Sequence, residues 1–323
     1  MLQYVPTHTL PGHHGAAITA VSVNTDGTLL ASCDTGGGIY IWSLPAGMIV
    51  QRIKASSAVL SMKWFPSNSA KMIAGTGDGT LITVELDQHA GQVNTRGIDA
   101  HGRKAIETLA LRAPKQLVHE TSSHLLASAG RDIIRVWAAH EGRGNTARPV
   151  MVASVNWMKE VDELLASFIY HGVVCWRWNS ATNAYAATWS IYMDLCGPCL
   201  PYPCGTRLAV CNIATGFDVY QIPSGLREVA LEPMEDVGIV IPIVFAHKHN
   251  LLVSGSRVGK IRIWDASTLQ HLQTVRIDGS PIVQAVTTHQ SFADASMIII
   301  GTSELDGLNT IQIWETKDTG VSN

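Results

Sequence analysis

Short runs of alternating apolar and polar residues recur along the chain, and each run is bounded by a turn. A clear copy is "LLVSGSRVGKIRIWDAST" at residues 251–268. Around Arg262 the period of two places the flanking isoleucines on one face of a strand and the arginine on the other. The apolar run before the glycine-bearing turn indicates a second strand. This stretch is therefore predicted to form a hairpin that ends on Trp264-Asp265.

Degenerate copies of this hairpin occur at 29–44, 72–86, 125–139, 164–179, 208–222 and 297–316. Alternating stretches before and after most copies supply a first and a fourth strand. The position that closes the third strand recurs every 40 to 53 residues, at Trp42, Val84, Trp137, Arg177, Tyr220, Trp264 and Trp314. A four-stranded unit of this period is typical of a propeller blade, which can bury both faces only between neighbouring blades. We therefore predict an all-β, seven-bladed β-propeller that occupies residues 1–323 as a single domain.

The last blade needs a strand from the start of the chain. Only nine residues follow Trp314, too few and too polar for another strand and loop. The stretch "LQYVPTHTL", residues 2–10, lies where a fourth strand stands in the other repeats. An unpaired edge strand would invite aggregation. We expect residues 2–10 to close the last blade by pairing with residues 310–316.

These repeats resemble the WD-repeat β-propeller family over essentially the whole chain. Trp264-Asp265 is the strict Trp-Asp dipeptide, and "PGHHG" at 11–15 carries the Gly-His that often opens such a repeat. In that family a His, a Ser or Thr, an Asp and the Trp form a hydrogen-bonded chain that stiffens a blade. The resemblance implies such a chain in one repeat, at His101, Ser128, Asp132 and Trp137.

The first repeat departs from this pattern. His13 and Ser32 accompany Trp42, but Gly36 occupies the position expected for the Asp. The closing tryptophans are expected to pack between blades, with an N–H that a polar network can satisfy. The residues assigned a structural role are Trp42, His101, Ser128, Asp132, Trp137, Trp264, Asp265 and Trp314.

Composition narrows the possible functions. The 323 residues are 46% apolar and 15% charged, with a formal charge of −3 at pH 7. This balance argues against a nucleic-acid binder that works through bulk positive charge. The first residues lack a charged segment followed by an apolar run, and no stretch approaches the roughly 20 apolar residues that cross a bilayer. We expect a cytoplasmic or nuclear protein that has no membrane or nucleic-acid partner.

A cysteine-rich stretch, "LCGPCLPYPC" at 195–204, offers the strongest candidate chemistry. Cys-x-x-Cys occurs in redox dithiols and in zinc sites. Alignment with the first repeat places Cys196 and Cys199 on a strand, where residues three apart point to opposite faces, and Cys211 at a core position equivalent to Ser254. Ordinary reduced cysteines are therefore favoured, with a zinc site and a redox site as the alternatives.

Three other motifs favour ordinary turns. The phosphate-loop-like "GTGDGT" at 75–80 is followed by a strand rather than by the helix that such loops require. His247 and His249 lack a nearby third ligand, and "KEVDE" at 159–163 lacks a nucleophile, so solvated turns are the preferred interpretation for both. No catalytic residue, metal ligand or cofactor is predicted.

A partner-binding rim is predicted from the loops before each first strand and the turns between second and third strands. In the resembled family these segments are the usual binding face, and loops on rigid scaffolds often carry function. The rim would present His13, His14, Asp78, Arg103, Arg131, Tyr170, His171, Tyr192, Met193, Asp236, Arg257 and Glu304. Mixed charges with aromatic residues suit a protein or peptide better than a phosphate.

The leading hypothesis is a non-catalytic scaffold, a monomeric domain within a complex, that binds a protein or peptide on this rim. One alternative is a substrate receptor of a ubiquitin ligase, because some relatives dock through a terminal Trp-Asp-x-Arg phrase. Trp264–Ser267 lacks the basic residue, and Trp314–Lys317 matches with two substitutions. A second alternative is a propeller enzyme, or a binder of a small ligand or metal, that uses the central channel and the clustered cysteines.

Overall fold

The computed structural model describes residues 2–87, 91–112, 125–130, 133–137, 151–158, 163–182, 184–231, 238–290, 296–303 and 309–318. Their regular elements are β-strands, which form seven antiparallel sheets of the blade type. The predicted class, an all-β, seven-bladed β-propeller, is confirmed. Two compact units can be distinguished, residues 1–59 with 241–323 and residues 60–240. The single domain over 1–323 stays a prediction, and each unit is described by itself.

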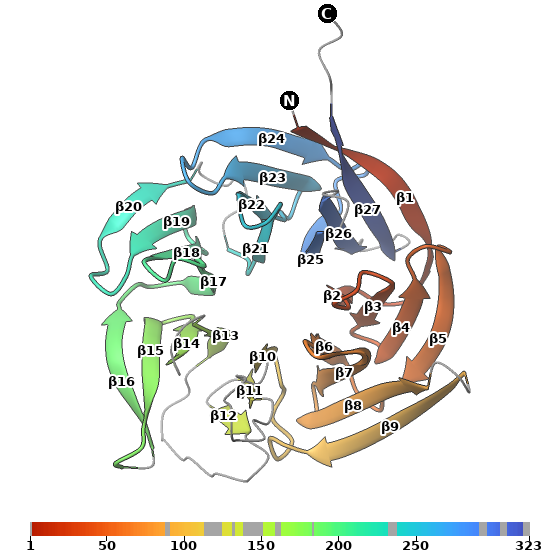
Figure 1. Cartoon of the computed structure of the whole chain (residues 1–323), viewed down its shortest axis with the longest axis horizontal. Helices are drawn as coiled ribbons and strands as arrows, with labels where there is room; N and C mark the ends of the chain where they lie inside the picture. Colours follow the sequence, from red (N-terminus) through yellow and green to blue (C-terminus); the bar gives the residue numbers. More distant parts are fainter. Residues whose placement is uncertain are drawn as a thin grey trace, which may run out of the picture. The chain divides into compact units, whose positions relative to one another are not determined.

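The first unit contains blades 1, 6 and 7, numbered in chain order (Figure 1). Blade 1 consists of β2 (Ile18–Val23), β3 (Leu29–Asp34), β4 (Gly38–Ser43) and β5 (Met48–Lys54). Blade 6 consists of β21 (Ile243–Ala246), β22 (Leu251–Ser254), β23 (Lys260–Asp265) and β24 (His271–Arg276). Blade 7 consists of β25 (Ile282–Gln290), β26 (Ser296–Ser303), β27 (Asn309–Asp318) and β1 (Leu2–His14).

Blade 7 is closed by the start of the chain, as predicted. Figure 1 shows β1 alongside β27, and the two strands are antiparallel with Leu10 opposite Ile311. The pairing extends further than residues 2–10, because His14 lies opposite Asn309 after a register shift. Strands that are distant in sequence thus share one sheet, and neither β26 nor β27 is left with an open edge.

The second unit contains blades 2 to 5. Blade 2 consists of β6 (Val59–Phe65), β7 (Asn68–Thr76), β8 (Thr80–Asp87) and β9 (Gln92–Asp99). Blade 3 has three strands in its described part, β10 (Thr108–Arg112), β11 (Leu125–Gly130) and β12 (Ile133–Trp137). Blade 4 consists of β13 (Val152–Trp157), β14 (Glu163–Phe168), β15 (Gly172–Asn179) and β16 (Ala184–Ile191). Blade 5 consists of β17 (Cys196–Pro201), β18 (Arg207–Asn212), β19 (Gly216–Gln221) and β20 (Arg227–Ala230).

Each unit buries its apolar side chains between adjacent blades. In the first unit Leu10 and Ile299 of blade 7 pack with Leu30 and Trp42 of blade 1. In the second unit Leu165 and other residues of blade 4 pack with blade 5. Because each sheet contributes apolar residues to its faces, neighbouring blades supply one another's core. The prediction that Trp42 packs between blades is confirmed.

The register of blade 4 corrects two expectations. Leu164 pairs with Trp176, so Trp176, and not Arg177, closes the third strand. Glu163 was expected in a solvated turn, but it begins β14 and is buried, and Arg177 Nη2 donates to its Oε1 at 2.6 Å. The observed register thus differs by one residue from the alignment that the sequence suggested, and such a difference exchanges the two faces of a strand. A charged residue therefore occupies a place that the repeat pattern assigns to an apolar one.

A similar shift corrects the interpretation of Cys211. In blade 6 the residue that faces Trp264 is Leu252, and Ser254 follows two positions later. In blade 5 Leu208 faces Tyr220, so the equivalent of Ser254 is Val210. Cys211 lies one residue further along β18 and is buried there.

Candidate functional site

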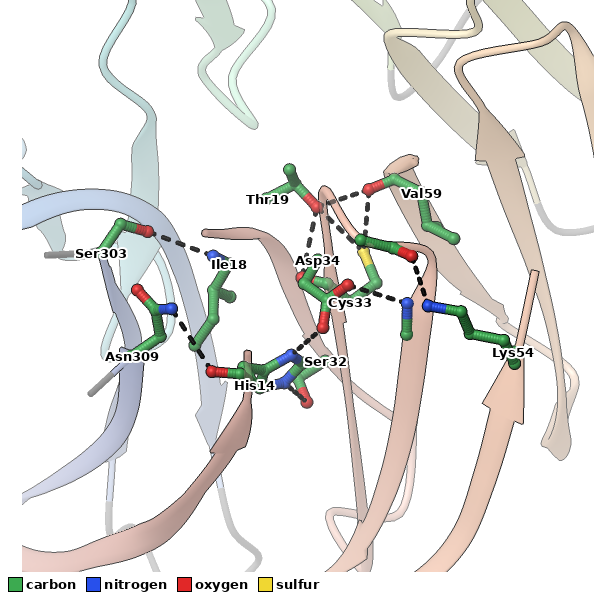
Figure 2. Close-up of polar contacts among 12 residues, drawn as sticks. His14, Ile18, Thr19, Ser32, Cys33, Asp34, Lys54, Val59, Ser303 and Asn309 are labelled. Carbon is green, nitrogen blue, oxygen red and sulfur yellow. Dashed lines mark hydrogen bonds and ion pairs between the residues drawn. The ribbon is translucent and has the colours of Figure 1, made fainter. Parts of the chain in front are cut away.

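A buried network of polar side chains joins the end of β1, a strand of blade 7, to β3 and β4 of blade 1. His14 Nδ1 lies 2.7 Å from Asp34 Oδ2, and His14 Nε2 lies 2.7 Å from Ser32 Oγ (Figure 2). Trp42 Nε1 donates to the same Ser32 Oγ at 2.9 Å. All four side chains are buried. They form a complete chain of hydrogen bonds from the closing tryptophan to a carboxylate.

The donors in this network follow from its chemistry. The indole N–H of Trp42 can only donate, so the Ser32 oxygen accepts from it and the Ser32 hydroxyl is free to donate to His14 Nε2. His14 Nδ1–H then donates to Asp34. Burial lowers the pKa of His14 below its ordinary value, while the hydrogen bond and charge of Asp34 act in the opposite direction. A neutral imidazole bridging Ser32 and Asp34 satisfies each of these groups.

This network corrects the prediction for the first repeat. The histidine is His14 rather than His13, and the carboxylate is Asp34 rather than a residue at Gly36. The register shift between Leu10 and His14 turns the second histidine inward. Asp34 ends β3, two residues after Ser32 and on the same face, and its Oδ1 accepts the Gly38 N–H at 2.8 Å. The carboxylate thus holds the turn as well as the histidine.

Hydrogen bonds around the network tie blade 1 to the chain on either side of it (Figure 2). On the blade 7 side, Asn309 Nδ2 donates to the His14 carbonyl at 3.3 Å, and the Ile18 N–H donates to Ser303 Oγ at 3.1 Å. On the other side, Thr19 Oγ1 donates to the carbonyl of Val59, which ends this part of the first unit, at 2.5 Å. This end of blade 1 is therefore a fixed support for the loops that it carries.

Blade 3 contains a histidine–serine hydrogen bond like that of the blade 1 network. His101 Nε2 lies 2.9 Å from Ser128 Oγ, as the resemblance implied. No described residue bonds to His101 Nδ1, and Asp132 lies outside the described residues. Burial, reinforced by the charge of Arg135, lowers the pKa of His101 to about 4. Trp137 pairs with Leu126 through the backbone.

Backbone hydrogen bonds connect the turn of one blade to the segment that enters the next. In the second unit the carbonyls of Thr76, Ile169 and Ile213 accept from Ile106, Cys196 and Gly238 at 2.8 to 2.9 Å. In the first unit Ser256 accepts from Val283 at 2.7 Å. We call the turns between second and third strands, with the segments before each first strand, the rim loops. These bonds hold the loops beside one another on the sheets of their own unit.

Comparison with known proteins agrees with this geometry. Residues 4–43 match the family model of the WD40 repeat, described as "WD domain, G-beta repeat". This range contains His14, Ser32, Asp34 and Trp42, the whole blade 1 network. Residues 4–43 are a WD repeat. This repeat begins on β1, which pairs in blade 7, and ends on β4 of blade 1, so it contributes to two sheets.

Part of the chain is similar to Actin-interacting protein 1 of Caenorhabditis elegans. The two are 34% identical over 96 residues, which are 29% of this chain. The match spans 14% of the relative's own length.

Of the nine predicted rim residues that the structure describes, six lie at the surface. His13, Arg103, Tyr170, His171, Tyr192 and Arg257 are exposed. Asp78 is half-buried and accepts hydrogen bonds from Thr76 Oγ1 at 2.6 Å and from the Thr80 N–H at 3.2 Å, so it stabilises its own turn. Arg131, Asp236 and Glu304 lie outside the described residues.

Two of the rim predictions are wrong about exposure. His14 is buried in the blade 1 network, and Met193 is buried in the cluster between blades 4 and 5. Both were assigned to the rim because they stand in loops before a first strand. Exposed apolar residues that sequence reasoning missed are Met151, Leu195 and Val240, all in or beside rim loops. No sequence period distinguishes them from buried loop residues.

The other structural tryptophans have different surroundings. Trp264 is buried, and Asp265 after it accepts hydrogen bonds from Ser267 and Thr268, which lowers the pKa of its carboxyl to about 2. Asp265 therefore organises the turn between β23 and β24. Trp314 is buried in the cluster between blades 6 and 7, and no described residue bonds to its Nε1.

The cysteines lie in apolar or turn positions without disulfides. Cys196 and Cys199 are on β17, as predicted, and are buried between blades 4 and 5. Burial raises the pKa of Cys199 to about 11 and raises that of Cys196 as well, so both thiols stay protonated at neutral pH. Within the described ranges, no group of three or more His, Cys, Asp or Glu side chains is placed to hold a metal ion.

The remaining sequence motifs lie where the repeat predicts. Residues 77–79 form the turn between β7 and β8, and His247 and His249 lie in the turn between β21 and β22.

Lys317 is exposed near the end of β27, opposite Gln3, and the ubiquitin-ligase hypothesis that depends on it stays a prediction. In the part of the chain that the structure describes, no helix has the length and apolar character needed to cross a bilayer.

Proposed function

We propose that this protein is a non-catalytic scaffold that binds a protein or peptide through its rim loops. The observation that carries the proposal is the set of backbone hydrogen bonds between rim loops, together with the exposed side chains that these loops present. Arginine and tyrosine are among the residues that most often anchor protein interfaces. Loops fixed on rigid sheets can hold such anchors in place before a partner arrives, which reduces the entropy lost on binding.

The experiment is affinity purification from the protein's own cell type with matched charge reversals. One variant carries Arg103→Glu and Arg257→Glu, both on exposed rim loops. The control carries Arg52→Glu and Arg96→Glu, both exposed on the outer strands β5 and β9. The two variants have the same net charge. The proposal expects that partners of the wild-type protein are lost with the rim variant and kept with the control, and identical recovery with both variants would contradict it.

A second candidate function, interaction with actin, is favoured by the likeness to Actin-interacting protein 1. Co-sedimentation with filamentous actin tests it directly, because bound protein pellets with the filaments. We expect the wild-type protein in the pellet and the rim variant in the supernatant. Wild-type protein that stays in the supernatant at micromolar filament concentrations would exclude this candidate and leave the general scaffold proposal standing.

A further inference from the structure

An exposed apolar patch lies on the rim loops of blades 4 and 5 and on the segment that follows blade 5. The exposed fraction is 75% for Tyr192, 53% for Tyr170, 43% for Val240, 40% for Met151 and 37% for Leu195. We call these five residues the blade 4–5 patch. Single exposed apolar residues are ordinary, but a group of them on neighbouring loops is typical of a binding surface.

Backbone hydrogen bonds hold the loops of the patch side by side. The Ile169 N–H, beside Tyr170, donates to the Met151 carbonyl at 2.9 Å, and the Ile169 carbonyl accepts from Cys196. The Leu195 carbonyl accepts from Ile213 at 2.8 Å, whose own carbonyl accepts from Gly238 near Val240. Each loop is therefore bonded to the next, and the five side chains stand on one connected segment of the rim.

Close packing fixes the loop that carries Tyr192. Met193 is buried between blades 4 and 5, so the chain is anchored between the exposed residues Tyr192 and Asp194. Gly172 has a φ of 77°, and a Cβ atom there would lie 2.0 Å from the Ile191 carbonyl oxygen. The turn that carries Tyr170 thus packs directly against the loop that carries Tyr192. No larger residue than glycine would allow this approach.

The charge of the patch is negative. Among the described residues of these loops, Asp194 is the one side chain with a formal charge at neutral pH. Tyr192 OH donates to Asp194 Oδ1 at 2.9 Å, which fixes the ring beside the carboxylate. Tyrosine rings carry negative potential on their faces and attract lysine and arginine side chains. Two exposed tyrosines and a carboxylate therefore complement a cation that is surrounded by apolar groups.

We propose that the blade 4–5 patch binds a protein segment in which a lysine or arginine is flanked by apolar residues. The apolar side chains of the segment cover Met151, Leu195 and Val240, while its cation lies against the tyrosine rings and Asp194. This inference rests on the proposed scaffold function and names the chemistry of one partner. A phosphate-bearing partner is disfavoured because Asp194 would repel it.

The test uses purified full-length protein and a degenerate pool of immobilised decapeptides, followed by fluorescence anisotropy with the peptides that are retained. We expect retained peptides to be enriched in lysine or arginine beside apolar residues. Replacing the cation by glutamine, or introducing Asp194→Asn, should weaken binding roughly fivefold, as expected for one partly exposed charge contact. Tyr192→Ala should weaken binding roughly tenfold or more.

Two substitutions in the same unit serve as controls. Ile98→Ala removes an exposed apolar side chain and Asp87→Asn removes an exposed carboxylate, both on strands of blade 2 and outside the loops of the patch. Both should bind the retained peptides as the wild-type protein does. Thermal unfolding of every variant should match the wild type, because the substituted side chains are exposed.

Several outcomes would overturn the inference. Retention of acidic or uncharged peptides, no retention at all, or binding that Tyr192→Ala and Asp194→Asn leave unchanged would each do so. Self-association of the protein that Tyr192→Ala abolishes, without peptide binding, would assign the patch to a second copy of the chain. None of these results affects the scaffold proposal, which is tested separately by partner recovery with the Arg103 and Arg257 variant.

Discussion

Blades 1 and 3 both hold a buried histidine against a serine of their second strand, but different charged groups act on the two rings. In blade 1 the Nδ1 of His14 faces the Asp34 carboxylate, which partly offsets the effect of burial on the pKa. In blade 3 burial and the charge of Arg135 both lower the pKa of His101, to about 4. The sign of the neighbouring charge thus affects how strongly a buried histidine resists protonation. The predictions below test this difference.

The largest effect is expected when the serine of blade 1 is removed. Ser32→Ala should lower the free energy of unfolding by about 4 kcal/mol, because it leaves both His14 Nε2 and Trp42 Nε1 without their partner. Ser128→Ala should also destabilise the protein, because it removes the partner of His101 Nε2. Chemical denaturation of the two variants measures both values. A loss below about 1 kcal/mol for Ser32→Ala would contradict the account of the network.

Acid should reduce stability through His101. Its pKa is about 4 in the folded protein and 6.5 ordinarily, so the unfolded chain binds more protons between these values. The contribution of His101 is fully present above pH 6.5 and decreases by up to about 3 kcal/mol as the pH falls to 4. Denaturation midpoints between pH 8 and 4 should fall less steeply in a His101→Gln variant than in the wild type. Parallel curves would show that His101 is not responsible.

Asp34→Asn should remove the charge that offsets the burial of His14. The amide oxygen can still accept from His14, but the charge is lost, and we expect a cost of about 2 kcal/mol at pH 7. The pKa of His14 should fall further, so the variant should also lose stability more steeply in acid. Nuclear magnetic resonance titration of His14 measures the shift. An unchanged pKa would mean that Asp34 does not offset burial.

The smallest effect is expected at the edge of the same turn. Lys54 is exposed, and its Nζ donates to the Gly36 carbonyl at 2.6 Å. Solvent competes for such a contact, so Lys54→Ala should change the free energy of unfolding by no more than about 0.5 kcal/mol. Thermal unfolding should therefore match the wild type. A large loss would show that the turn, rather than the buried network, stabilises this end of blade 1.

The sequence predicted the architecture because the repeat is a property of the whole chain. Seven degenerate hairpin repeats and the strand at residues 2–10 were enough to predict seven blades and the pairing of the chain ends. Individual positions were harder. A bulge before His14 decides which of two adjacent histidines turns inward, and in blade 4 the apolar run begins one strand position later, after the buried Glu163. Both depend on tertiary contacts that local periodicity does not report.

Residues of the candidate site were only partly predictable for the same reason. Tyr170 and Tyr192 could be assigned to rim loops from the order of the strands alone. Met193 could not be separated from its neighbours, because its burial depends on blade 5 packing against blade 4. Leu195 is exposed beside it with a φ of 56°, a conformation that the sequence gives no reason to expect of leucine.

Closure of blade 7 by β1 is the central claim, and thermal unfolding of a chain that lacks residues 2–10 tests it most directly. The deletion removes the buried side chains of Tyr4 and Leu10 and the partner of β27. We predict a loss of about 5 kcal/mol or more, which lowers the melting temperature by roughly 10 °C or more. A synthetic peptide of residues 2–14 should restore part of the loss, while Thr9→Ala, exposed on the same strand, should have little effect. A melting temperature unchanged by the deletion would contradict the account.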